Sequence, residues 1–319
     1  MRILFIADPL ESFKVYKDST FAMMAEAARR GHQLAAMLQD ELAWKDGLIV
    51  GRHRALSLTG DEDEWYRVGA EATLPLRDFD AVIMRKDPPF DIEYVTSTWL
   101  LEHAQRQGAR VYNDARAIRD HSEKLAIMQF AQFCVPTLVS RLADDVNAFI
   151  DQHRDVILKP LDGMGGTGIF RVGATDPNRN VIIETLSQLG TRTLMAQRYI
   201  PEIRDGDHRV LLIGGKAVPF TLARIPKAGE TRGNLAAGGT GIARPLTARQ
   251  REITDALGPE LARRGLLLVG LDVIGDYLTE VNCTSPTCFR EITAQTGVNV
   301  AGMFIDAVEV AGRAPTQSA

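Results

Sequence analysis

The sequence predicts a mixed α/β and α+β protein with three domains: an N-terminal open parallel sheet, a small central α+β lid domain and a larger C-terminal α+β domain. Three observations support this prediction. Strand and helix patterns alternate over roughly the first 115 residues, which is typical of an open parallel sheet. A glycine-rich hairpin follows, and a hairpin with acidic and amide side chains lies near the end. The predicted domains are residues 1–120, 121–198 and 199–319.

The composition favours a globular protein and argues against several partners. The 319 residues are 45% hydrophobic with a formal charge of −4 and no basic run, so we expect neither nucleic acid nor an anionic membrane as a partner. No segment reaches the ~18 apolar residues of a membrane span, and the apolar start is too short for a signal peptide, so we expect a cytoplasmic location. Cys134, Cys283 and Cys288 lack metal-type spacing and support neither a disulfide framework nor a zinc site.

The first domain is predicted from four segments. Residues 2–8 (RILFIAD) and 80–91 (DAVIMRKDPPFD) are apolar strands, and residues 19–31 and 96–108 are helices that end at glycine. Ligands of open parallel sheets bind at the carboxyl ends of the strands. Four charged side chains there form the expected substrate edge: Asp8, Arg85, Lys86 and Asp87. An equally good alternative is that Arg85 and Lys86 only solvate a loop.

The central domain contains the spacing G-x-G-x-x-G at Gly163, Gly165 and Gly168. A dinucleotide-binding turn would continue into a helix. Residues 169–172 (IFRV) instead predict a strand, so the glycines join two antiparallel strands and form a flap over phosphates, toward which Lys159 would point. An ordinary glycine-rich turn is the alternative.

Three further elements complete the central domain. We expect a helix over residues 122–131, capped by Ser122 and with Lys124 in its first turn. Residues 135–140 and 193–201 predict strands, and the second of these strands would lead into the last domain.

A candidate metal site lies in residues 269–288 (VGLDVIGDYLTEVNCTSPTC). A tight turn would bring Asp272 opposite Glu280, and Asn282 shares the strand face of Glu280 because it is two residues away. Two carboxylates and an amide suit Mg²⁺, which takes its remaining ligands from water and phosphate. A polar sheet face in solvent is the alternative, but Asp272 lies inside an apolar run, where an unpaired carboxylate would be costly.

The last domain also contains arginines and a glycine-rich segment. Asp207 and Arg209 share a strand face, and Arg224 ends the next strand; they form either surface ion pairs or a charge-neutralising set beside transferring phosphate. Residues 226–241 (PKAGETRGNLAAGGTG) cannot form a core, so we predict a closing lid that delivers Arg232. Helices are expected over residues 247–265 and 300–312.

The order strand, lysine, glycine flap, strand, and later Asp…Glu-x-Asn on a hairpin, resembles the ATP-grasp superfamily. The strings MRKDPPFD, ILKPLDGMGG, ARIPKAGETRGNLAAGG and TSPTC are similar to those of bacterial glutathione synthetases over nearly the whole chain. Cys283 and the string GGTGIARPLT depart from the family pattern at loop positions. The resemblance implies a Rossmann-like substrate domain followed by two ATP-grasp subdomains.

The resemblance also implies a reaction: ATP- and Mg²⁺-dependent ligation of γ-glutamylcysteine and glycine to glutathione through an acyl phosphate, with release of ADP and phosphate. Mn²⁺ is an alternative metal, and a homotetramer is implied. The implied nucleotide-binding residues are Lys124, Lys159, Gly165, Gly166, Thr167, Gly168, Gln197, Arg198, Tyr199, Ile200 and Asp207. The implied metal ligands are Asp272, Glu280 and Asn282, and the catalytic cations are Arg209, Arg224 and Arg232. The implied substrate-binding residues are Arg85, Asn234, Ser285, Pro286, Thr287 and Cys288.

Two alternatives remain open at the level of sequence. Another ATP-grasp carboxylate–amine ligase, such as a D-alanyl-D-alanine or ribosomal-protein glutamate ligase, would differ only at the substrate edge. A non-catalytic ATP-binding module would keep the fold without turnover, although the acidic hairpin and the arginine-bearing segment argue against it.

Overall fold

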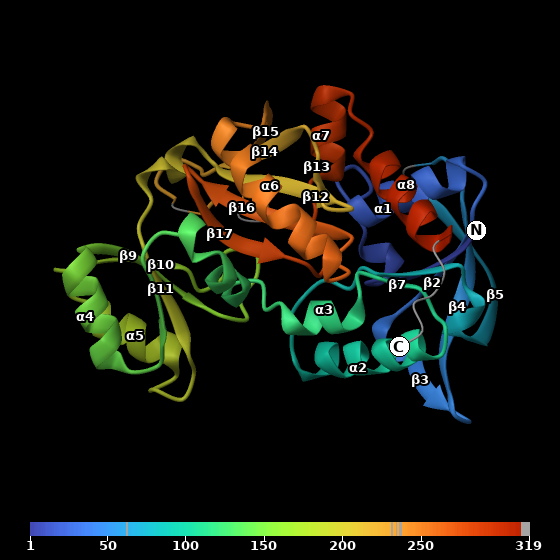
Figure 1. The fold of residues 1–319 in the computed structure, drawn as a ribbon, viewed down its shortest axis with the longest axis horizontal. Helices are drawn as coiled ribbons and strands as arrows, with labels where there is room; N and C mark the ends of the chain where they lie inside the picture. Colours follow the sequence, from blue (N-terminus) through green and yellow to red (C-terminus); the bar gives the residue numbers. More distant parts are fainter. Residues whose placement is uncertain (62, 231, 234, 236–237, 314–319) are drawn as a thin grey trace.

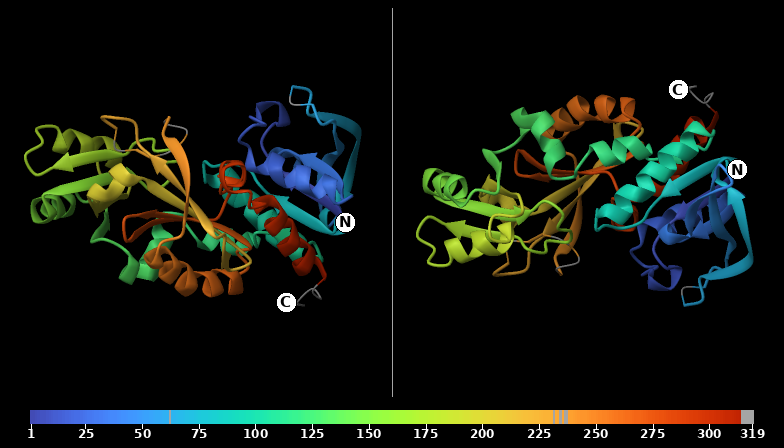
Figure 2. Two further views of the ribbon diagram at one scale, coloured as in Figure 1. Left: turned by 90° about the horizontal axis from the view of Figure 1, so that it is seen from above. Right: turned by 90° about the horizontal axis from the view of Figure 1, so that it is seen from below.

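The computed structural model describes residues 1–61, 63–230, 232–233, 235 and 238–313, which form three sheets with their covering helices. The sheets lie in a row along the long axis of the molecule, with the C-terminal sheet between the other two (Figure 1), and the views from above and below show the same row (Figure 2). The predicted fold class, with α/β and α+β parts, is confirmed.

The N-terminal sheet has a parallel core in the order β2-β1-β6-β7. On β1, Ile3 and Phe5 pack with α1, whereas Leu4 and Ile6 pack with α2, so the two helices cover opposite faces. The elements are β1 (Arg2–Ile6), α1 (Ser19–Arg29), β2 (Gln33–Met37), β6 (Ala81–Met84), α2 (Ile92–Arg106), β7 (Val111–Tyr112) and α3 (Ala115–Asp120). The alternation of strands and helices is confirmed.

This sheet has an antiparallel extension that is not predicted from the sequence. Strands β3 (Leu42–Lys45), β4 (Leu48–Leu58) and β5 (Tyr66–Pro75) add to the edge at β2, with β4 paired to all three neighbours. Short 3-10 turns flank the extension, η2 (Gln39–Glu41) before β3 and η3 (Leu76–Asp78) after β5, and a further one, η1 (Leu10–Ser12), lies between β1 and α1.

The central sheet has four antiparallel strands in the order β10-β9-β11-β8, covered on one face by α4 and α5. Strands β9 and β10 pair antiparallel around the glycine-rich loop, which confirms the predicted hairpin. The elements are β8 (Thr137–Ser140), α4 (Ala143–His153), β9 (Asp155–Pro160), β10 (Phe170–Gly173), α5 (Arg179–Ser187) and β11 (Leu194–Arg198).

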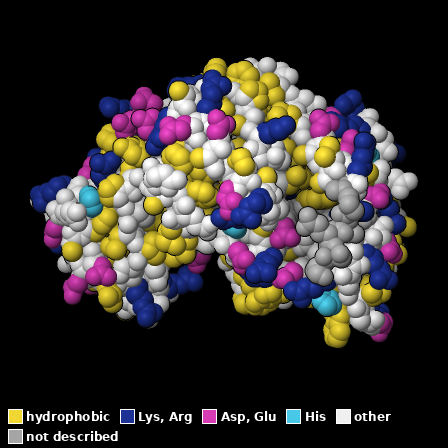
Figure 3. All heavy atoms as spheres, in the orientation of Figure 1, with side chains coloured by type: hydrophobic (Ala, Val, Ile, Leu, Met, Phe, Trp, Pro, Cys, Tyr) yellow, Lys and Arg dark blue, Asp and Glu magenta, His cyan; other side chains and the backbone are white. Residues whose placement is uncertain are grey.

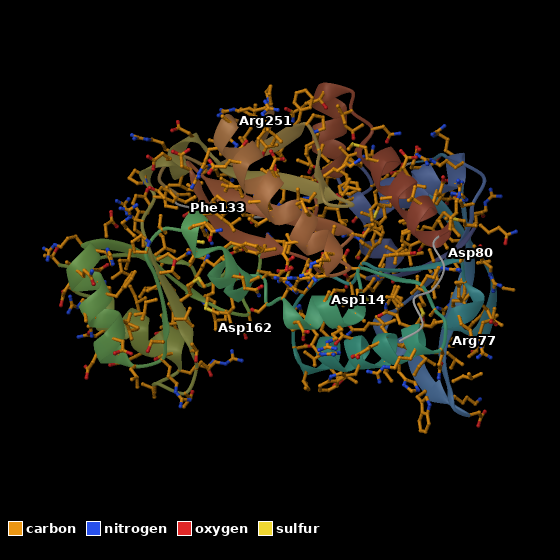
Figure 4. All side chains as sticks on the ribbon, viewed as in Figure 1. Arg77, Asp80, Asp114, Phe133, Asp162 and Arg251 are labelled. Carbon is orange, nitrogen blue, oxygen red and sulfur yellow. The ribbon has the colours of Figure 1, made fainter. Side chains whose placement is uncertain are left out.

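The helix expected over residues 122–131 is a 3-10 helix and begins later than expected. A 3-10 helix, η4 (Leu125–Phe133), occupies this region; Lys124 precedes it, and Ser122 does not cap it. The segment is not one regular helix, because Phe130 has φ −130° and ψ 37° and forms a kink between two short helical pieces. Ile127, Phe130 and Phe133 are all buried in the same apolar cluster, so packing against the third sheet accompanies this irregular geometry. Figure 4 shows Phe133 at the end of η4 beside the six-stranded sheet.

The third sheet has the order β15-β14-β12-β16-β17, with β13 paired to β12. On β12, Val210 and Leu212 pack with α6, whereas Leu211 and Ile213 pack with α7 and α8. Its elements are η5 (Pro201–Asp205), β12 (Asp207–Ile213), β13 (Lys216–Ala217), β14 (Phe220–Ile225), β15 (Thr240–Pro245), α6 (Ala248–Arg263), β16 (Leu268–Ile274), β17 (Tyr277–Asn282), α7 (Phe289–Thr296) and α8 (Val300–Arg313).

The final helix joins two parts of the molecule. Helix α8 packs on α1 of the first sheet, and Arg30 at the end of α1 lies 2.6 Å from Asp306 and 3.3 Å from Glu309. His32 also contacts Glu309, at 2.9 Å. The end of the chain therefore covers the first sheet as well as the third.

Candidate active site

A cavity of about 500 Å³ lies among the three sheets, and most of the predicted site residues line it. The space-filling view shows a notch between the four-stranded lobe and the rest of the molecule (Figure 3). In Figure 4, Asp162, at the root of the glycine loop, lies on the side of that lobe that faces Asp114. The predicted residues in the cavity wall are Arg85, Lys124, Lys159, Gly165, Gly166, Thr167, Gln197, Arg198, Tyr199, Ile200, Asp207, Arg209, Arg224, Arg232, Asp272, Glu280, Asn282, Ser285, Pro286, Thr287 and Cys288.

Gly168 and Asn234 need separate comment. Gly168 does not line the cavity: its φ is 72°, and a β-carbon there would lie 3.2 Å from Cγ of Pro160. Its role is to shape the turn of the flap, since a side chain would be strained at that angle. Asn234 lies outside the described residues.

The flap closes one end of the cavity. Gly165 and Gly166 have φ angles of 61° and 85°, which glycine adopts without strain. Nζ of Lys124 lies 2.5 Å from the carbonyl oxygen of Gly163, so this lysine ties η4 to the flap. Backbone N–H groups and a lysine thus meet at the same end, as an anion site requires.

Two buried lysines and one carboxylate form the next part of the wall. Oε1 of Glu280 lies 3.4 Å from Nζ of Lys159 and 3.7 Å from Nζ of Lys124. Burial lowers the pKa of Lys159, although Glu280 opposes this effect. Two cations share one carboxylate, so this corner has room for additional negative charge such as phosphate.

The acidic hairpin forms as predicted. Asp272 pairs with Glu280 across β16 and β17, and a β-bulge follows at the next residue. Asn282 pairs with Gly270 and donates its Nδ2 to that glycine's carbonyl oxygen at 3.1 Å, which leaves Oδ1 for another partner. The Glu280 carboxylate and the Asn282 amide therefore offer hard oxygen donors on the same face.

The third predicted oxygen ligand has other partners. Nε of Arg209 lies 2.6 Å from Oδ1 of Asp272, and Nη2 of Arg224 lies 2.9 Å from Oδ2. Within the described ranges, no group of three His, Cys, Asp or Glu side chains could hold a metal ion. The donor set fits Mg²⁺ or a similar hard ion only if phosphate oxygens supply further ligands.

The arginines form a buried network in place of surface ion pairs. Arg224 bridges the two carboxylates, since its Nη2 also lies 2.5 Å from Oδ2 of Asp207. Burial raises the pKa of Asp207 to about 6, because Arg224 only partly offsets desolvation and Asp272 opposes ionisation. Burial would also raise the pKa of Asp272, but Arg209 and Arg224 outweigh it and lower that pKa. Two positive and two negative side chains thus neutralise one another beside the cavity.

The glycine-rich segment lies against this network. Gly233, Leu235 and Arg232 line the cavity. A β-carbon on Gly233 would lie 3.0 Å from Cβ of Asp207, so only glycine allows the backbone to approach this closely. Arg232 is paired with Glu230 in its own segment.

The substrate edge divides into two parts. Arg85 is 4% exposed and donates from Nε to Oγ1 of Thr20 at 3.0 Å, so it does not solvate a loop. Asp87 accepts a hydrogen bond from Ser285 and lines the cavity. Asp8 and Lys86 instead pair with each other, with Nζ–Oδ1 at 2.7 Å, and do not line it.

Some residues of the wall carry no signal in the sequence analysis. Glu123 is partly buried; its Oε1 accepts from Thr284 Oγ1 at 2.7 Å and from the backbone N–H groups of Cys283 and Thr284 at 3.1 and 3.2 Å. Burial raises the pKa of Glu123. The carboxylate therefore fixes the loop after β17 to η4. Asp18 and Glu291 also line the cavity, and no motif marks either of them.

The described helices include none that is long and apolar enough to cross a membrane.

Two protein-family models match this chain in succession. The prokaryotic glutathione synthetase N-terminal domain matches residues 1–119, and the prokaryotic glutathione synthetase ATP-grasp domain matches residues 123–297.

Curated relatives are similar over nearly their full length. A glutathione synthetase from Ralstonia nicotianae is 65% identical over 315 residues, or 98% of this chain and 97% of the relative. One from Pseudomonas aeruginosa is 52% identical over 308 residues, or 97% of each chain.

Solved structures share the fold at low identity. The D-cycloserine synthetase DcsG superposes with a TM-score of 0.68 at 15% identity, covering 97% of this chain and 99% of that one. A RimK domain ATP-grasp protein from Sphaerobacter thermophilus gives a TM-score of 0.63 at 20% identity, covering 96% and 99%. The chain therefore has the ATP-grasp fold and belongs to the prokaryotic glutathione synthetase family.

Proposed function

We infer that the cavity is the active site of an ATP-dependent ligase that forms glutathione, joining the cysteinyl carboxylate of γ-glutamylcysteine to the amine of glycine. Family membership supports this reaction for the chain as a whole. The observation that carries the assignment to this cavity is its wall, where a glycine flap with two buried lysines adjoins an acidic hairpin and an arginine network.

At the flap end, we assign the phosphates of ATP to Lys124, Lys159 and the loop from Gly165 to Thr167. Glu280 holds both lysines at 3.4 and 3.7 Å, so incoming phosphate would exchange one carboxylate partner for a more highly charged one. The backbone of β11 and the residues after it, from Gln197 to Ile200, would contact adenine, and Asp207 the ribose. Arg198 and Tyr199 belong to the same wall.

We propose Mg²⁺ as the metal, with Mn²⁺ as the alternative. Glu280 and Asn282 would be ligands through oxygens on one face of β17. Asp272 would be the third ligand through a remaining lone pair of a carboxylate oxygen, since each of its two oxygens already accepts from an arginine. The ion would neutralise charge on the phosphates.

The chemistry assigns a separate task to the arginines. The cysteinyl carboxylate attacks the γ-phosphorus of ATP, ADP leaves, and an acyl phosphate results. The neutral amine of glycine then attacks the acyl carbon, phosphate leaves with the electron pair of the C–O bond, and the amine proton is lost. Arg209, Arg224 and, from the glycine-rich segment, Arg232 would stabilise the negative charge that builds up in these steps.

Further assignments rest on family resemblance and on the wall of the cavity. Arg85, Asn234 and the turn from Ser285 to Cys288, including Pro286 and Thr287, would bind substrate carboxylates. We propose that residues 1–120 act as the substrate domain and that 121–198 and 199–319 act as the two ATP-grasp subdomains. A cytoplasmic homotetramer is the proposed working form.

The test is a product assay with purified protein, ATP, Mg²⁺, γ-glutamylcysteine and glycine. We expect one ADP and one phosphate for each glutathione, identified by mass. A panel with D-alanine and glutamate as amine acceptors separates this activity from other carboxylate–amine ligases. ADP release with an alternative acceptor but not with glycine would contradict the assignment, and binding of ATP without turnover of any acceptor would indicate a binding module.

A further inference from the structure

Asn113 connects the first sheet to the hairpin that carries the proposed metal ligands. It lies between β7 and α3, is 5% exposed and does not line the cavity. Its Nδ2 donates to the carbonyl oxygen of Leu268 at 2.7 Å and to that of Cys283 at 2.8 Å. Its Oδ1 accepts the backbone N–H of Leu268 at 2.8 Å. Both amide hydrogens and the amide oxygen are therefore used, and all three bonds go to the β16–β17 hairpin.

These bonds hold the open end of the hairpin. Leu268 is the first residue of β16, and Cys283 directly follows Asn282, the last residue of β17. The turn of the hairpin, at residues 275–276, lies at the opposite end. One side-chain amide thus spans the two strand ends that the turn itself does not hold together.

The same bonds lie close to one proposed metal ligand. Asn282 pairs with Gly270 and donates from Nδ2 to its carbonyl oxygen at 3.1 Å, which leaves Oδ1 for another partner. Gly270 lies two residues after Leu268. Asn282 directly precedes Cys283. Asn113 therefore holds the backbone within two residues of both members of this pair.

The surroundings of Asn113 are closely packed. The backbone N–H of Asp114 donates to the carbonyl oxygen of Gly265 at 3.0 Å, and a β-carbon on Gly265 would lie 2.6 Å from Cβ of Asp114. Figure 4 shows Asp114 at this junction, beside the end of α6. Oε1 of Glu123 accepts the N–H of Cys283 at 3.1 Å. The residue after Asn282 is therefore fixed at its N–H group by Glu123 and at its carbonyl oxygen by the Asn113 amide.

We propose that Asn113 is a positioning residue for the metal site: it fixes the strand ends so that the amide oxygen of Asn282 faces the metal. An asparagine side chain suits this task because it offers two donors and an acceptor in one plane. Loss of a group that orients a metal ligand without touching the metal typically costs about 10- to 100-fold in metal affinity. This inference rests on the proposed function, which assigns the metal and the phosphates to this hairpin.

The test measures the effect of the metal on nucleotide binding, without turnover. Calorimetry gives the affinity of the protein for β,γ-imido-ATP with Mg²⁺ and with EDTA, and the ratio of the two affinities is the metal enhancement. In the wild type the enhancement should be about 10-fold or more, because the ion bridges phosphate and protein oxygens. In Asn113→Asp it should fall to about 2-fold or less, because a carboxylate oxygen would face two carbonyl oxygens and displace the strand ends.

The affinity measured with EDTA serves as an internal reference. It should change by less than about 2-fold in Asn113→Asp, because the side chain of Asn113 bonds to neither the flap nor its lysines. An affinity constant describes the folded molecules, so a smaller folded fraction does not alter the enhancement.

Gln105→Leu is the matched control. Gln105 is a side-chain amide at the same junction: its Nε2 donates to Oδ2 of Asp114 at 2.9 Å, and its Oε1 accepts the N–H of Ala115 at 3.2 Å. Both bonds stay within the first domain. Loss of this amide should lower the urea midpoint and keep the metal enhancement of the wild type, whereas a purely structural role of Asn113 would give the same result in its own variants.

Hydrogen exchange of the ligand-free proteins locates the change. In Asn113→Ala, which removes the three bonds and adds no charge, peptides that contain Leu268 or Cys283 should exchange faster than in the wild type, and those of β1 should not. Asn113→Ala also replaces Asn113→Asp in calorimetry if the aspartate prevents folding. Its metal enhancement should be at least about 3-fold below that of the wild type.

An unchanged metal enhancement in the Asn113 variants overturns the inference, and so does an equal loss in Gln105→Leu. Absence of any enhancement in the wild type also overturns it, because the hairpin would then hold no metal. Failure of the proposed function is recognised separately: the wild type would form no glutathione, while its metal enhancement and the effect of Asn113 would still be measured.

Discussion

Loss of the Arg224 side chain should destabilise the third sheet. Its guanidinium lies 2.5 Å from Asp207 and 2.9 Å from Asp272, and the side chain is 4% exposed. In Arg224→Leu the new side chain fills part of the volume, but Asp207 stays buried without the guanidinium to which it is bonded. Removing one partner of a buried ion pair costs about 3–5 kcal/mol, so the free energy of unfolding should fall by that amount at pH 7.

The pH dependence provides a second check on this explanation. The pKa of Asp207 is already raised by burial to about 6, above its unfolded value, and loss of Arg224 would raise it further. The folded state therefore loses stability as pH rises through that range, and protonation at lower pH removes the stranded charge. The destabilisation in Arg224→Leu should be smaller at pH 5 than at pH 7.

Urea unfolding followed by circular dichroism measures both effects without bound ligand. Arg263→Leu is the control, because Arg263 is 72% exposed and pairs with Glu260 on the same helix at 2.8 Å. Exposed pairs contribute about 0–1 kcal/mol, and leucine has a similar helix propensity to arginine. A loss in Arg224→Leu no larger than that in the control, or equal at both pH values, would refute the buried-network argument.

Three further predictions concern turnover. Glu280→Gln should reduce turnover by about 10²-fold or more even at saturating Mg²⁺, because it removes both the proposed metal ligand and the carboxylate beside two lysines; near wild-type turnover would contradict the metal assignment. Lys159→Met should weaken ATP binding measured by calorimetry while far-UV circular dichroism stays unchanged, and unaltered affinity would remove the main support for the flap. Replacing residues 227–239 with a tight turn should raise ADP formed per glutathione above one, because water would compete with glycine for the acyl phosphate; an unchanged rate and ratio would make the segment a passive connection.

The sequence was most informative where one local pattern determines one contact. The two-residue spacing of Glu280 and Asn282 and the tight turn before them were enough to predict the pairing with Asp272, which the structure has. The residues after the glycine loop have a strand pattern and not a helix pattern, which was enough to predict the hairpin that β9 and β10 form. Such features depend on short-range geometry, which a single sequence contains.

Features that depend on contacts between distant parts of the chain could not be predicted from local sequence patterns. Glu123 and Glu291 enter the cavity wall because η4 and α7 pack where they do, and nothing in their neighbouring residues marks those positions. The burial of the arginine network has the same cause: a two-residue spacing predicts a shared face for Asp207 and Arg209, but the segment that approaches this face, at Gly233, comes from later in the chain. The antiparallel strands β3 to β5 extend the edge of a sheet whose core alone was predicted from the alternation.

The contact between α8 and α1 can form only after nearly the whole chain has been synthesised. Arg30 meets Asp306, a residue 276 positions later in the chain. At about 5–20 residues per second of synthesis, roughly 14–55 s separate the two residues as they leave the peptidyl-transferase centre. During that interval, the face of α1 that α8 covers has no cover from its own chain. Met24 and Ala27, which belong to the same buried cluster as Phe304 and Ile305, are part of the apolar surface that a nascent chain would present to chaperones.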